Sequence, residues 1–287
     1  MVDVTFIILT KNESKNITDC INSIKNFASR IVIVDSGSDD DTCAIAKKLG
    51  ADVYTHKFEN YSKQFNWGLD NTNITTKWSF RFDADERLTP QLIKELEYLA
   101  KEHDSDNVNG IIMEAWLYFM GRKIKHGCHN KRKLMMFKTG TARIEDRRMD
   151  EHTILSSGTA IIAKNKFIHY DYKDLTSWIN KMNWYATREM QDYYEYKMGK
   201  SYVLQNEDKI INKTRKKKFG FYYKFPLFIR CRLLFFYNYI IKLGFLDGKE
   251  GYVYHYMYHM WYRTLVDGKI LEQKKTNKPF EETGDLK

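Results

Sequence analysis

The sequence predicts an α/β fold, with a mostly parallel, mixed β-sheet flanked by helices and followed by a helical extension rich in basic and aromatic residues. Two observations carry this prediction. Short β-branched apolar runs alternate with amphipathic helical patterns through residues 4–102, which is typical of parallel sheets covered by helices. Polar turns follow three of the strands, and such sheets bind ligands beyond the carboxyl ends of their strands.

The expected elements follow one another in regular order. Strands are expected at short apolar runs rich in β-branched and aromatic residues, namely 4–9, 31–34, 51–55, 78–82, 109–118, 133–138 and 160–172, the last running into a loop. Helices are expected where apolar residues recur every three or four positions, namely 16–27, 43–49, 60–71, 91–102, 175–197 and 251–269.

The chain of 287 residues, 43% of them hydrophobic, is long enough for a sizeable core. We expect one domain over residues 1–200, a helical extension over 201–272 and a polar tail over 273–287. Four cysteines without a C-x-x-C spacing favour a reducing compartment and no zinc site. The N-terminus lacks the basic start of a signal peptide, and no apolar run approaches the roughly 18 residues of a transmembrane helix.

An acidic turn follows the strand expected at residues 78–82. Asp83 and Asp85 lie two positions apart at its carboxyl end, so the period of a strand points both side chains the same way. Two such carboxylates repel each other unless a cation lies between them, and oxygen ligands suit Mn²⁺ or Mg²⁺. The pattern predicts a metal site shared with substrate phosphates. A solvated turn before a helix whose first turn favours acids is the alternative.

Two more polar turns follow strands, at residues 10–13 and 35–42. Because parallel strands end at the same edge of a sheet, we expect both turns to line one rim with residues 83–86. Capping of the next helix is an alternative role for Asp35 and Ser38. Both roles are satisfied if Ser38 or Asp39 caps the helix while Asp35 binds a ligand.

In order and spacing, these three turns resemble the family 2 glycosyltransferases, which are inverting enzymes of the GT-A fold. Thr-Lys-Asn-Glu at 10–13 is similar to the turn after their first strand, and residues 35–42 resemble their D-x-G-S-x-D-x-T motif with one extra acid. Asp-Ala-Asp-Glu at 83–86 looks like the D-x-D motif of bacterial lipopolysaccharide-core, capsule and O-antigen sugar transferases. The resemblance extends over residues 1–200, and residues 243–251 look like the C-terminal block of that subgroup.

The resemblance implies a nucleotide-sugar donor, a UDP-sugar in the first place. It implies that Asp35 accepts a hydrogen bond from the base, while Thr10 and Glu13 flank the same cleft. Lys63 is expected to reach the nucleotide, with a solvated helix lysine as the alternative.

The resemblance also implies how Mn²⁺ or Mg²⁺ is held. Asp85 would ligate the metal directly, and Asp83 would contact the ribose or a metal-bound water. His169 is a candidate third ligand, as a late His is in some GT-A enzymes, and a structural His bonded to a turn is the alternative. Arg148, together with Arg132, is a candidate for binding the diphosphate.

Inversion in a single displacement requires a general base that takes the proton of the acceptor hydroxyl. The acidic cluster within residues 144–155 supplies the candidates. A Glu in a similar context fills this role in the resembling subgroup, which points to Glu151. Asp150 is the second candidate, because related enzymes use the Asp of a Glu-Asp pair, and a surface turn without a catalytic role is the third interpretation.

Residues 209–242 hold ten Lys or Arg, ten Phe or Tyr and no Asp or Glu, and so match the whole net charge of +10. We expect this segment, with its basic run at 213–218 and its aromatic residues between 219 and 236, to bind an anionic membrane surface. That placement suits a lipid-linked acceptor and a protein on the inner, cytoplasmic face of a bacterial membrane. A packed helix with a basic face is the alternative, and no nucleic-acid-binding fold accompanies the segment.

Two other functions fit parts of the pattern. A sugar nucleotidyltransferase would use the same Asp pair but attack the α-phosphate, with a basic residue near the first strand instead of a base at 150–151. A non-catalytic, membrane-bound scaffold for polysaccharide assembly would not require the intact acidic pairs at 83 and 85 and at 150 and 151.

Overall fold

The computed structural model describes residues 2–127, 132–145, 151–170, 174–199 and 220–276. The chain divides into two compact units, Met1–Leu117 with Asn130–Tyr170 and Tyr118–His129 with Asp171–Lys287. This division differs from the boundary expected at residue 200. Helix α5 (Leu175–Lys197) belongs to the second unit because it packs along α9 (Tyr262–Thr276).

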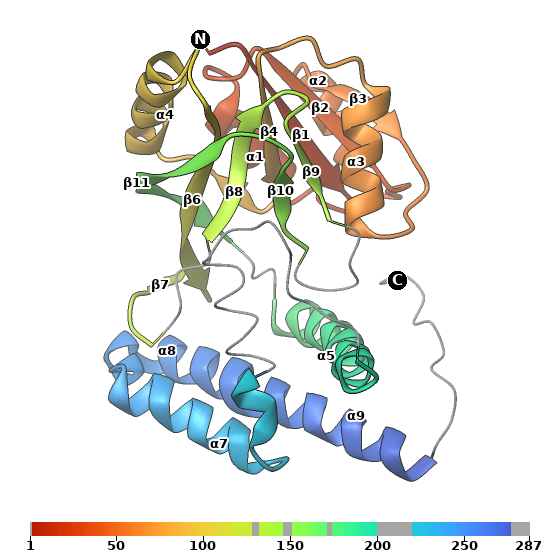
Figure 1. The fold of residues 1–287 in the computed structure, drawn as a ribbon, viewed down its shortest axis with the longest axis vertical. Helices are drawn as coiled ribbons and strands as arrows, with labels where there is room; N and C mark the ends of the chain where they lie inside the picture. Colours follow the sequence, from red (N-terminus) through yellow and green to blue (C-terminus); the bar gives the residue numbers. More distant parts are fainter. Residues whose placement is uncertain (1, 128–131, 146–150, 171–173, 200–219, 277–287) are drawn as a thin grey trace. The chain divides into compact units, whose positions relative to one another are not determined.

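A mixed β-sheet forms the centre of the first unit (Figure 1). Its strand order is β3-β2-β1-β4-β8-β6-β11-β5, with β7 paired to β6; β5 is Glu86–Arg87 and β7 is Arg122–Ile124. Strands β3, β2, β1 and β4 are parallel neighbours, β8 runs antiparallel to β4 and β6, and β11 is parallel to β6. The main strands are β1 Val4–Thr10, β2 Arg30–Asp35, β3 Asp52–Thr55, β4 Trp78–Asp83, β6 Val108–Phe119, β8 Arg132–Lys138 and β11 Thr159–His169. The predicted mostly parallel, mixed sheet is therefore confirmed.

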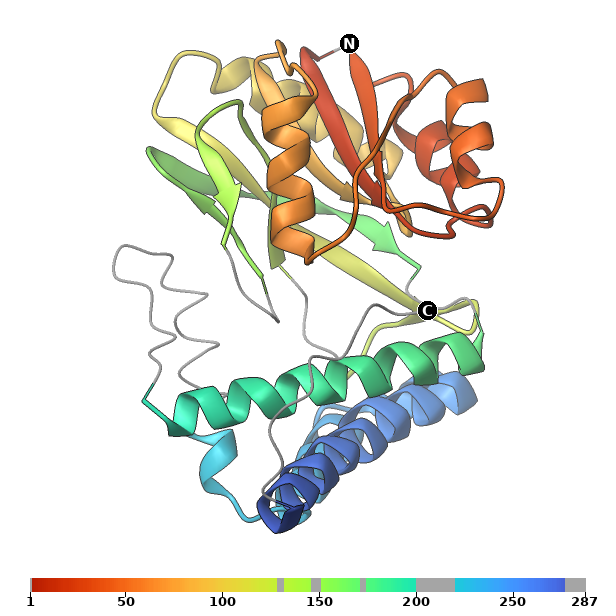
Figure 2. The same cartoon turned by 90° about the vertical axis from the view of Figure 1, so that its right-hand side faces the viewer.

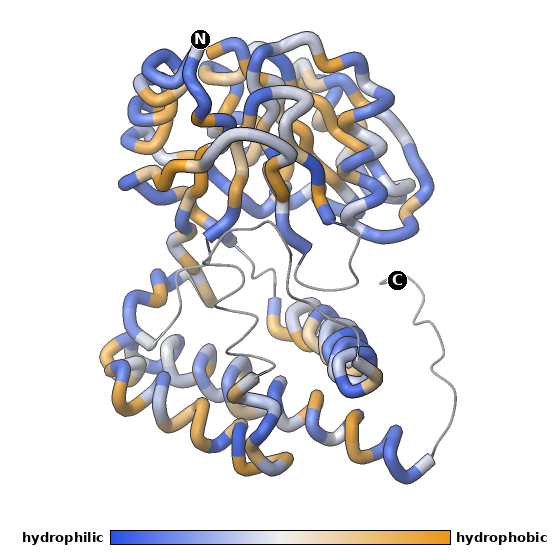
Figure 3. Tube along the Cα trace, in the orientation of Figure 1, coloured by the Kyte–Doolittle hydropathy of each residue, from blue (hydrophilic) through white to orange (hydrophobic). Residues whose placement is uncertain are grey.

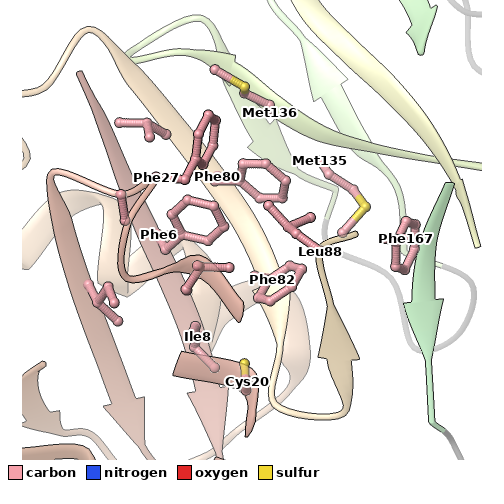
Figure 4. Close-up of a cluster of buried hydrophobic side chains, with 14 of the residues drawn as sticks. Phe6, Ile8, Cys20, Phe27, Phe80, Phe82, Leu88, Met135, Met136 and Phe167 are labelled. Carbon is pink, nitrogen blue, oxygen red and sulfur yellow. The ribbon is translucent and has the colours of Figure 1, made fainter. Parts of the chain in front are cut away.

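Helices cover both faces of this sheet (Figure 2). They are α1 Ile17–Ile24, α2 Thr42–Lys48, α3 Tyr61–Asn71 and α4 Pro90–Glu102. The alternation along β1 explains the two layers: Phe6 and Ile8 pack in a core with residues of α1, α2 and α4, whereas Ile7 packs in a second core with Phe65 of α3. Phe6 stacks on Phe80 of β4 at a ring distance of 4.3 Å within the larger core (Figure 4).

Short side chains before the helices determine where they begin. Asn60 accepts a hydrogen bond from the Lys63 N–H and caps α3, and Thr89 accepts one from Leu92 and caps α4, which has Pro90 at its first position. The first helix ends at Ile24, three residues earlier than the predicted bound, although Phe27 remains buried.

Four short strands were not predicted, because two or three residues show no period. They are β5 Glu86–Arg87, β7 Arg122–Ile124, β9 Ala142–Ile144 and β10 Thr153–Leu155. Strands β9 and β10 pair as a separate antiparallel ribbon, and β5 pairs with β11. The last pair matters for the site, because it places His169 opposite Glu86.

The second unit is helical and its helices are joined by buried ion pairs. After α5 its described elements are η1 Tyr222–Lys224, α7 Ile229–Phe236, η2 Tyr237–Ile241, η3 Gly244–Asp247, α8 Gly248–His255, η4 Tyr256–Trp261 and α9. Glu189 of α5 accepts hydrogen bonds from Tyr223, Tyr262 and Arg263. Among the residues placed by the structure, no helix combines the length and apolar composition needed to cross a membrane.

Candidate active site

The three polar turns begin at matched positions of neighbouring parallel strands. Thr10 of β1 pairs with Asp35 of β2, and Leu9 of β1 pairs with Asp83 of β4. All three strands therefore end at one level of the sheet, and their turns share one rim as expected. The rim lies entirely within the first unit.

Asp35 organises the turn after β2. Its Oδ1 accepts hydrogen bonds from the backbone N–H groups of Gly37 and Ser38 at 2.8 and 2.7 Å. Its Oδ2 accepts from the hydroxyls of Thr10 and Ser38 at 2.7 and 2.6 Å. Burial opposes ionisation, but these hydrogen bonds outweigh it and lower the pKa of Asp35. With 1% exposure and four hydrogen bonds, Asp35 shapes the turn, and its contact with a base stays a prediction.

The turn after β1 is bonded to the turn after β2. The N–H of Asn12 donates to Ser38 Oγ at 2.9 Å, and the N–H of Asp39 donates to Asn12 Oδ1 at 3.1 Å. The N–H of Glu13 donates to the Thr42 hydroxyl at 2.8 Å. The two turns are therefore one hydrogen-bonded unit, in which Thr10 and Glu13 lie as predicted beside the same rim.

The expected capping by Ser38 or Asp39 is wrong. Asp40 satisfies the start of α2 instead, because its Oδ1 accepts from the Thr42 N–H at 3.0 Å and its Oδ2 from the Ser14 N–H at 3.1 Å. Burial raises the pKa of Asp40, but the hydrogen bonds from Thr42 and Ser14 outweigh it and lower the value to about 2. The extra acid of the motif thus ties α2 to the first turn.

Asp83 lies in a cluster of charged side chains at the end of β4. Tyr61 of α3 donates its hydroxyl to Asp83 Oδ1 at 2.6 Å, and Lys133 of β8 donates to Asp83 Oδ2 at 2.8 Å. Lys133 also donates to Glu86 Oε1 at 2.7 Å. Arg81 places its guanidinium 4.6 Å from the centre of the Tyr61 ring and donates to the Tyr61 hydroxyl at 3.1 Å.

The surroundings of this cluster shift the pKa values of Asp83 and Glu86 in opposite directions. Burial opposes ionisation of Asp83, but Lys133 and Arg81 outweigh it and hold the pKa of Asp83 well below its usual range. Glu86 is fully buried, and burial together with neighbouring Asp83 raises its pKa despite the attraction of Lys133. Asp83 therefore holds its charge to lower pH than Glu86 does.

Asp85 and His169 come together from distant parts of the chain. His169 Nε2 lies 3.4 Å from Asp85 Oδ2, and the next residue, Tyr170, donates its N–H to the Asp85 carbonyl at 2.8 Å. The side chains of His169 and Asp85 are 10% and 19% exposed. A carboxylate oxygen and an imidazole nitrogen at this separation fit a divalent ion that replaces their direct contact. Across the described residues, no group of three or more His, Cys, Asp or Glu side chains is arranged to hold a metal by itself.

Glu151 lies just before β10, beside the charged cluster. Arg81 donates to its backbone carbonyl at 3.4 Å and to the Thr153 hydroxyl at 3.3 Å. Its side chain is partly exposed. The other catalytic candidate, Asp150, and the diphosphate candidate, Arg148, lie outside the described residues.

Two predicted nucleotide or diphosphate contacts have other partners in the structure. Lys63, half exposed on α3, forms an ion pair with Glu59, which precedes the helix, as a solvated lysine would. Arg132 donates to Glu114 at 2.6 Å. Both ion pairs involve a partly exposed cation, and the role of Lys63 in nucleotide binding stays a prediction.

The site also contains three residues that the sequence did not single out. Tyr61, Arg81 and Lys133 come from α3, β4 and β8 and meet only through the fold. One signal was present: a basic residue within the buried run of β4 has to be paired with an acid or an aromatic ring. The sequence alone does not show which partner that is.

Comparison with known proteins shows the family to which the chain belongs. Residues 5–170, which are more than half of the chain, match the model of the family described as glycosyl transferase family 2. The uncharacterized glycosyltransferase RP128 of Rickettsia prowazekii is 27% identical over 67% of this chain and 68% of its own length. The lipopolysaccharide core biosynthesis glycosyltransferase LpsC of Rhizobium meliloti is 27% identical over 66% of this chain and 70% of its own.

Among solved structures, the glucosyl-3-phosphoglycerate synthase of Mycobacterium tuberculosis is similar over 40% of this chain and 44% of its own, with 18% identity and a TM-score of 0.33. That likeness is too distant to bear on function. The match of the family model over the whole of the strand-and-turn region does bear on it, since it includes every described residue of the rim. The chain belongs to glycosyl transferase family 2 and is a glycosyltransferase.

Proposed function

We propose that this glycosyltransferase transfers a sugar from a UDP-sugar donor to a lipid-linked saccharide acceptor. The transfer inverts the configuration at the anomeric carbon and requires a divalent metal ion. The observation that carries the proposal is the convergence at one rim of an ionised Asp83, the Asp85–His169 pair and the bonded turns of β1 and β2. Acidic groups gathered at such an edge suit a cation and the phosphates that it neutralises.

Asp85 and His169 would hold the ion, Mn²⁺ or Mg²⁺. Lewis-acid stabilisation of the departing diphosphate would come from the metal held there. Because the described residues supply two ligands at this place, the diphosphate and water would complete the shell. Asp83, kept ionised by Lys133 and Arg81, accepts a hydrogen bond from the ribose or from a metal-bound water.

Glu151 takes the proton of the acceptor hydroxyl in this proposal. Arg81 donates a hydrogen bond to the backbone carbonyl of Glu151. Arg81 also donates to the hydroxyl of Tyr61, which in turn donates to Asp83, so the same arginine contacts both the base and the donor site. Arg81 itself is 8% exposed and lies over the Tyr61 ring. Asp150 is the second candidate for this role.

The proposal also includes the kind of acceptor and the place of the protein in the cell. The basic run at 213–218, which lies outside the described residues, suits a peripheral position on the inner face of a bacterial cytoplasmic membrane, where a lipid-linked acceptor of surface polysaccharide synthesis is available. Neutralising the four cations at 215–218 is expected to release the protein from anionic vesicles at low salt.

The test is a screen of purified protein against nucleotide sugars with Mn²⁺, scored by donor hydrolysis and by Mn²⁺ binding. Asp85→Asn is expected to lose both, whereas Asp70→Asn, which removes a surface carboxylate paired with Arg143 in the same unit, is expected to lose neither. Chelator-resistant hydrolysis, or release of diphosphate from a nucleoside triphosphate instead of transfer from a sugar nucleotide, would contradict the proposal.

A further inference from the structure

Exposed apolar side chains are concentrated in one stretch of the second unit. Among the residues that the structure describes, 19 large hydrophobic residues are exposed, and 13 of them lie between Phe221 and Tyr256. Scattered surface hydrophobic residues are ordinary in a folded protein, but such a concentration marks a surface that binds something. In Figure 3, orange segments recur along α7, within this stretch.

The exposed residues of α7 and η2 form a stripe. Ile229, Leu233, Phe236 and Ile240 follow one another at spacings of four, three and four, which is one side of a helix. They are 49%, 50%, 54% and 40% exposed. An amphipathic helix normally turns such a stripe toward the core, yet here it faces solvent.

Contacts between aromatic rings join the segment that carries this stripe, α7 and η2, to α8 and η4. Phe235 lies 6.1 Å from Tyr256, and Tyr239 lies 5.7 Å from Tyr252. Tyr252 and Tyr256 are themselves 48% and 42% exposed. The exposed apolar residues of this stretch, which we call the apolar face, are Phe221, Phe225, Ile229, Leu233, Phe236, Tyr237, Ile240, Ile241, Leu243, Phe245, Leu246, Tyr252 and Tyr256.

Buried polar contacts prevent these helices from turning the apolar face inward. Arg230 and Asp267, which are 2% and 0% exposed, form an ion pair that joins α7 to α9. On α7 this charged residue is directly next to Ile229, so rotating the stripe into the core would pull a buried guanidinium away from its partner. Leaving a buried charge unpaired is strongly unfavourable.

The charges around the apolar face are basic. Residues 220–246 contain no Asp or Glu, and their cations are Lys224, Arg232 and Lys242, besides Arg230, which is buried against Asp267. The next acid, Asp247, is 2% exposed and accepts hydrogen bonds from the N–H groups of Lys125 and His126. The acid after it, Glu250, has a side chain that is 36% exposed and is paired with Arg122. An apolar surface bordered mainly by cations is complementary to an anionic lipid headgroup layer above an acyl core.

We propose that the apolar face docks on the surface of an anionic membrane, with the Leu, Ile and Phe side chains below the headgroups, the Tyr side chains at their level and the cations on lipid phosphates. This inference rests on the proposed function, whose lipid-linked acceptor lies in the same membrane. It assigns contacts beyond the basic aromatic segment, since Tyr252 and Tyr256 take part. It also corrects one expectation: Tyr223 is 6% exposed and bonded to Glu189, and does not insert.

The test is co-sedimentation of the full chain with vesicles of phosphatidylcholine alone and of phosphatidylcholine with phosphatidylglycerol. Leu233→Ser with Phe236→Ser is expected to weaken binding to the anionic vesicles about tenfold or more, because both side chains are about half exposed and burying the rest of the two together contributes roughly that factor. The matched control is Tyr98→Ser with Ile162→Ser, two exposed hydrophobic residues of the first unit, which is expected to bind as the unaltered protein does.

Donor hydrolysis and the thermal midpoint are measured on every variant. If Leu233→Ser with Phe236→Ser still hydrolyses the donor but no longer binds the vesicles, the docking surface is supported. If no protein hydrolyses the donor, while the unaltered protein binds the vesicles, the result counts against the proposed function alone. Undiminished binding of Leu233→Ser with Phe236→Ser would overturn the inference. So would light scattering that shows a dimer of the unaltered protein broken by these changes without any vesicle binding, because the face would then join two copies.

Discussion

Replacing Lys133 by Met tests the charged cluster most directly. The ammonium lies 2.8 Å from Asp83 Oδ2 and 2.7 Å from Glu86 Oε1, and Met keeps the length of the apolar stem while removing both contacts. Asp83 retains Tyr61 and has Arg81 nearby, but the Glu86 side chain, only 1% exposed, loses its cation.

The expected loss follows from this burial. Removing one partner of a buried ion pair costs about 3–5 kcal/mol, and we expect the lower end, about 3 kcal/mol, because Lys133 and Asp83 keep some contact with water. Glu86 can escape part of the cost by taking up a proton, since burial already raises its pKa. Loss of Lys133 raises that pKa further.

The sign of the pH dependence follows from linkage. A carboxyl group whose pKa is higher in the folded protein binds its proton more tightly there than in the unfolded chain. Its stabilising contribution is therefore full below the unfolded value of about 4.3 and is lost as the pH rises through the folded value. The Lys133→Met variant is expected to be only mildly destabilised near pH 5 and fully destabilised near pH 8.

Thermal unfolding at both pH values measures this effect, with Lys133→Met/Glu86→Gln as the companion. The double variant removes the uncompensated charge and is expected to recover most of the stability at the higher pH. An equal loss of stability at both pH values, or no recovery in the double variant, would refute the conclusion that Glu86 is the buried charge left without a partner.

Three further predictions concern the metal, the base and the core. His169→Gln is expected to weaken Mn²⁺ binding about tenfold or more while the protein stays folded, as followed by Mn²⁺ electron paramagnetic resonance; unchanged affinity would favour a structural His. Glu151→Gln is expected to lower transfer by about 100-fold or more without weakening UDP binding, and if Asp150→Asn alone does so, the base is Asp150. Phe80→Ala is expected to cost about 3–5 kcal/mol in the free energy of unfolding, because Phe80 is fully buried and stacked on Phe6; a loss below about 1 kcal/mol would show a looser core.

The acidic rim could be predicted because each of its turns is local to one strand end. Asp35 and Asp83 directly end β2 and β4, and the parallel pairing with β1 then aligns them. The pairing of Asp85 with His169 was suggested only by resemblance. The structure explains the contact through the pairing of β11 with β5, a two-residue strand that shows no period in the sequence.

Sequence by itself determined the alternation of strands and helices, the places where the chain turns and the acids that follow those strands, because these features depend on spacing along a few consecutive residues. Only the tertiary structure decided which side chains pair with the acids. Lys133 and Tyr61 reach Asp83 from 50 and 22 positions away, and Arg230 reaches Asp267 across 37. Such pairs depend on which elements pack together, and burial, which sets the strength of each pair, is a property of the folded chain alone.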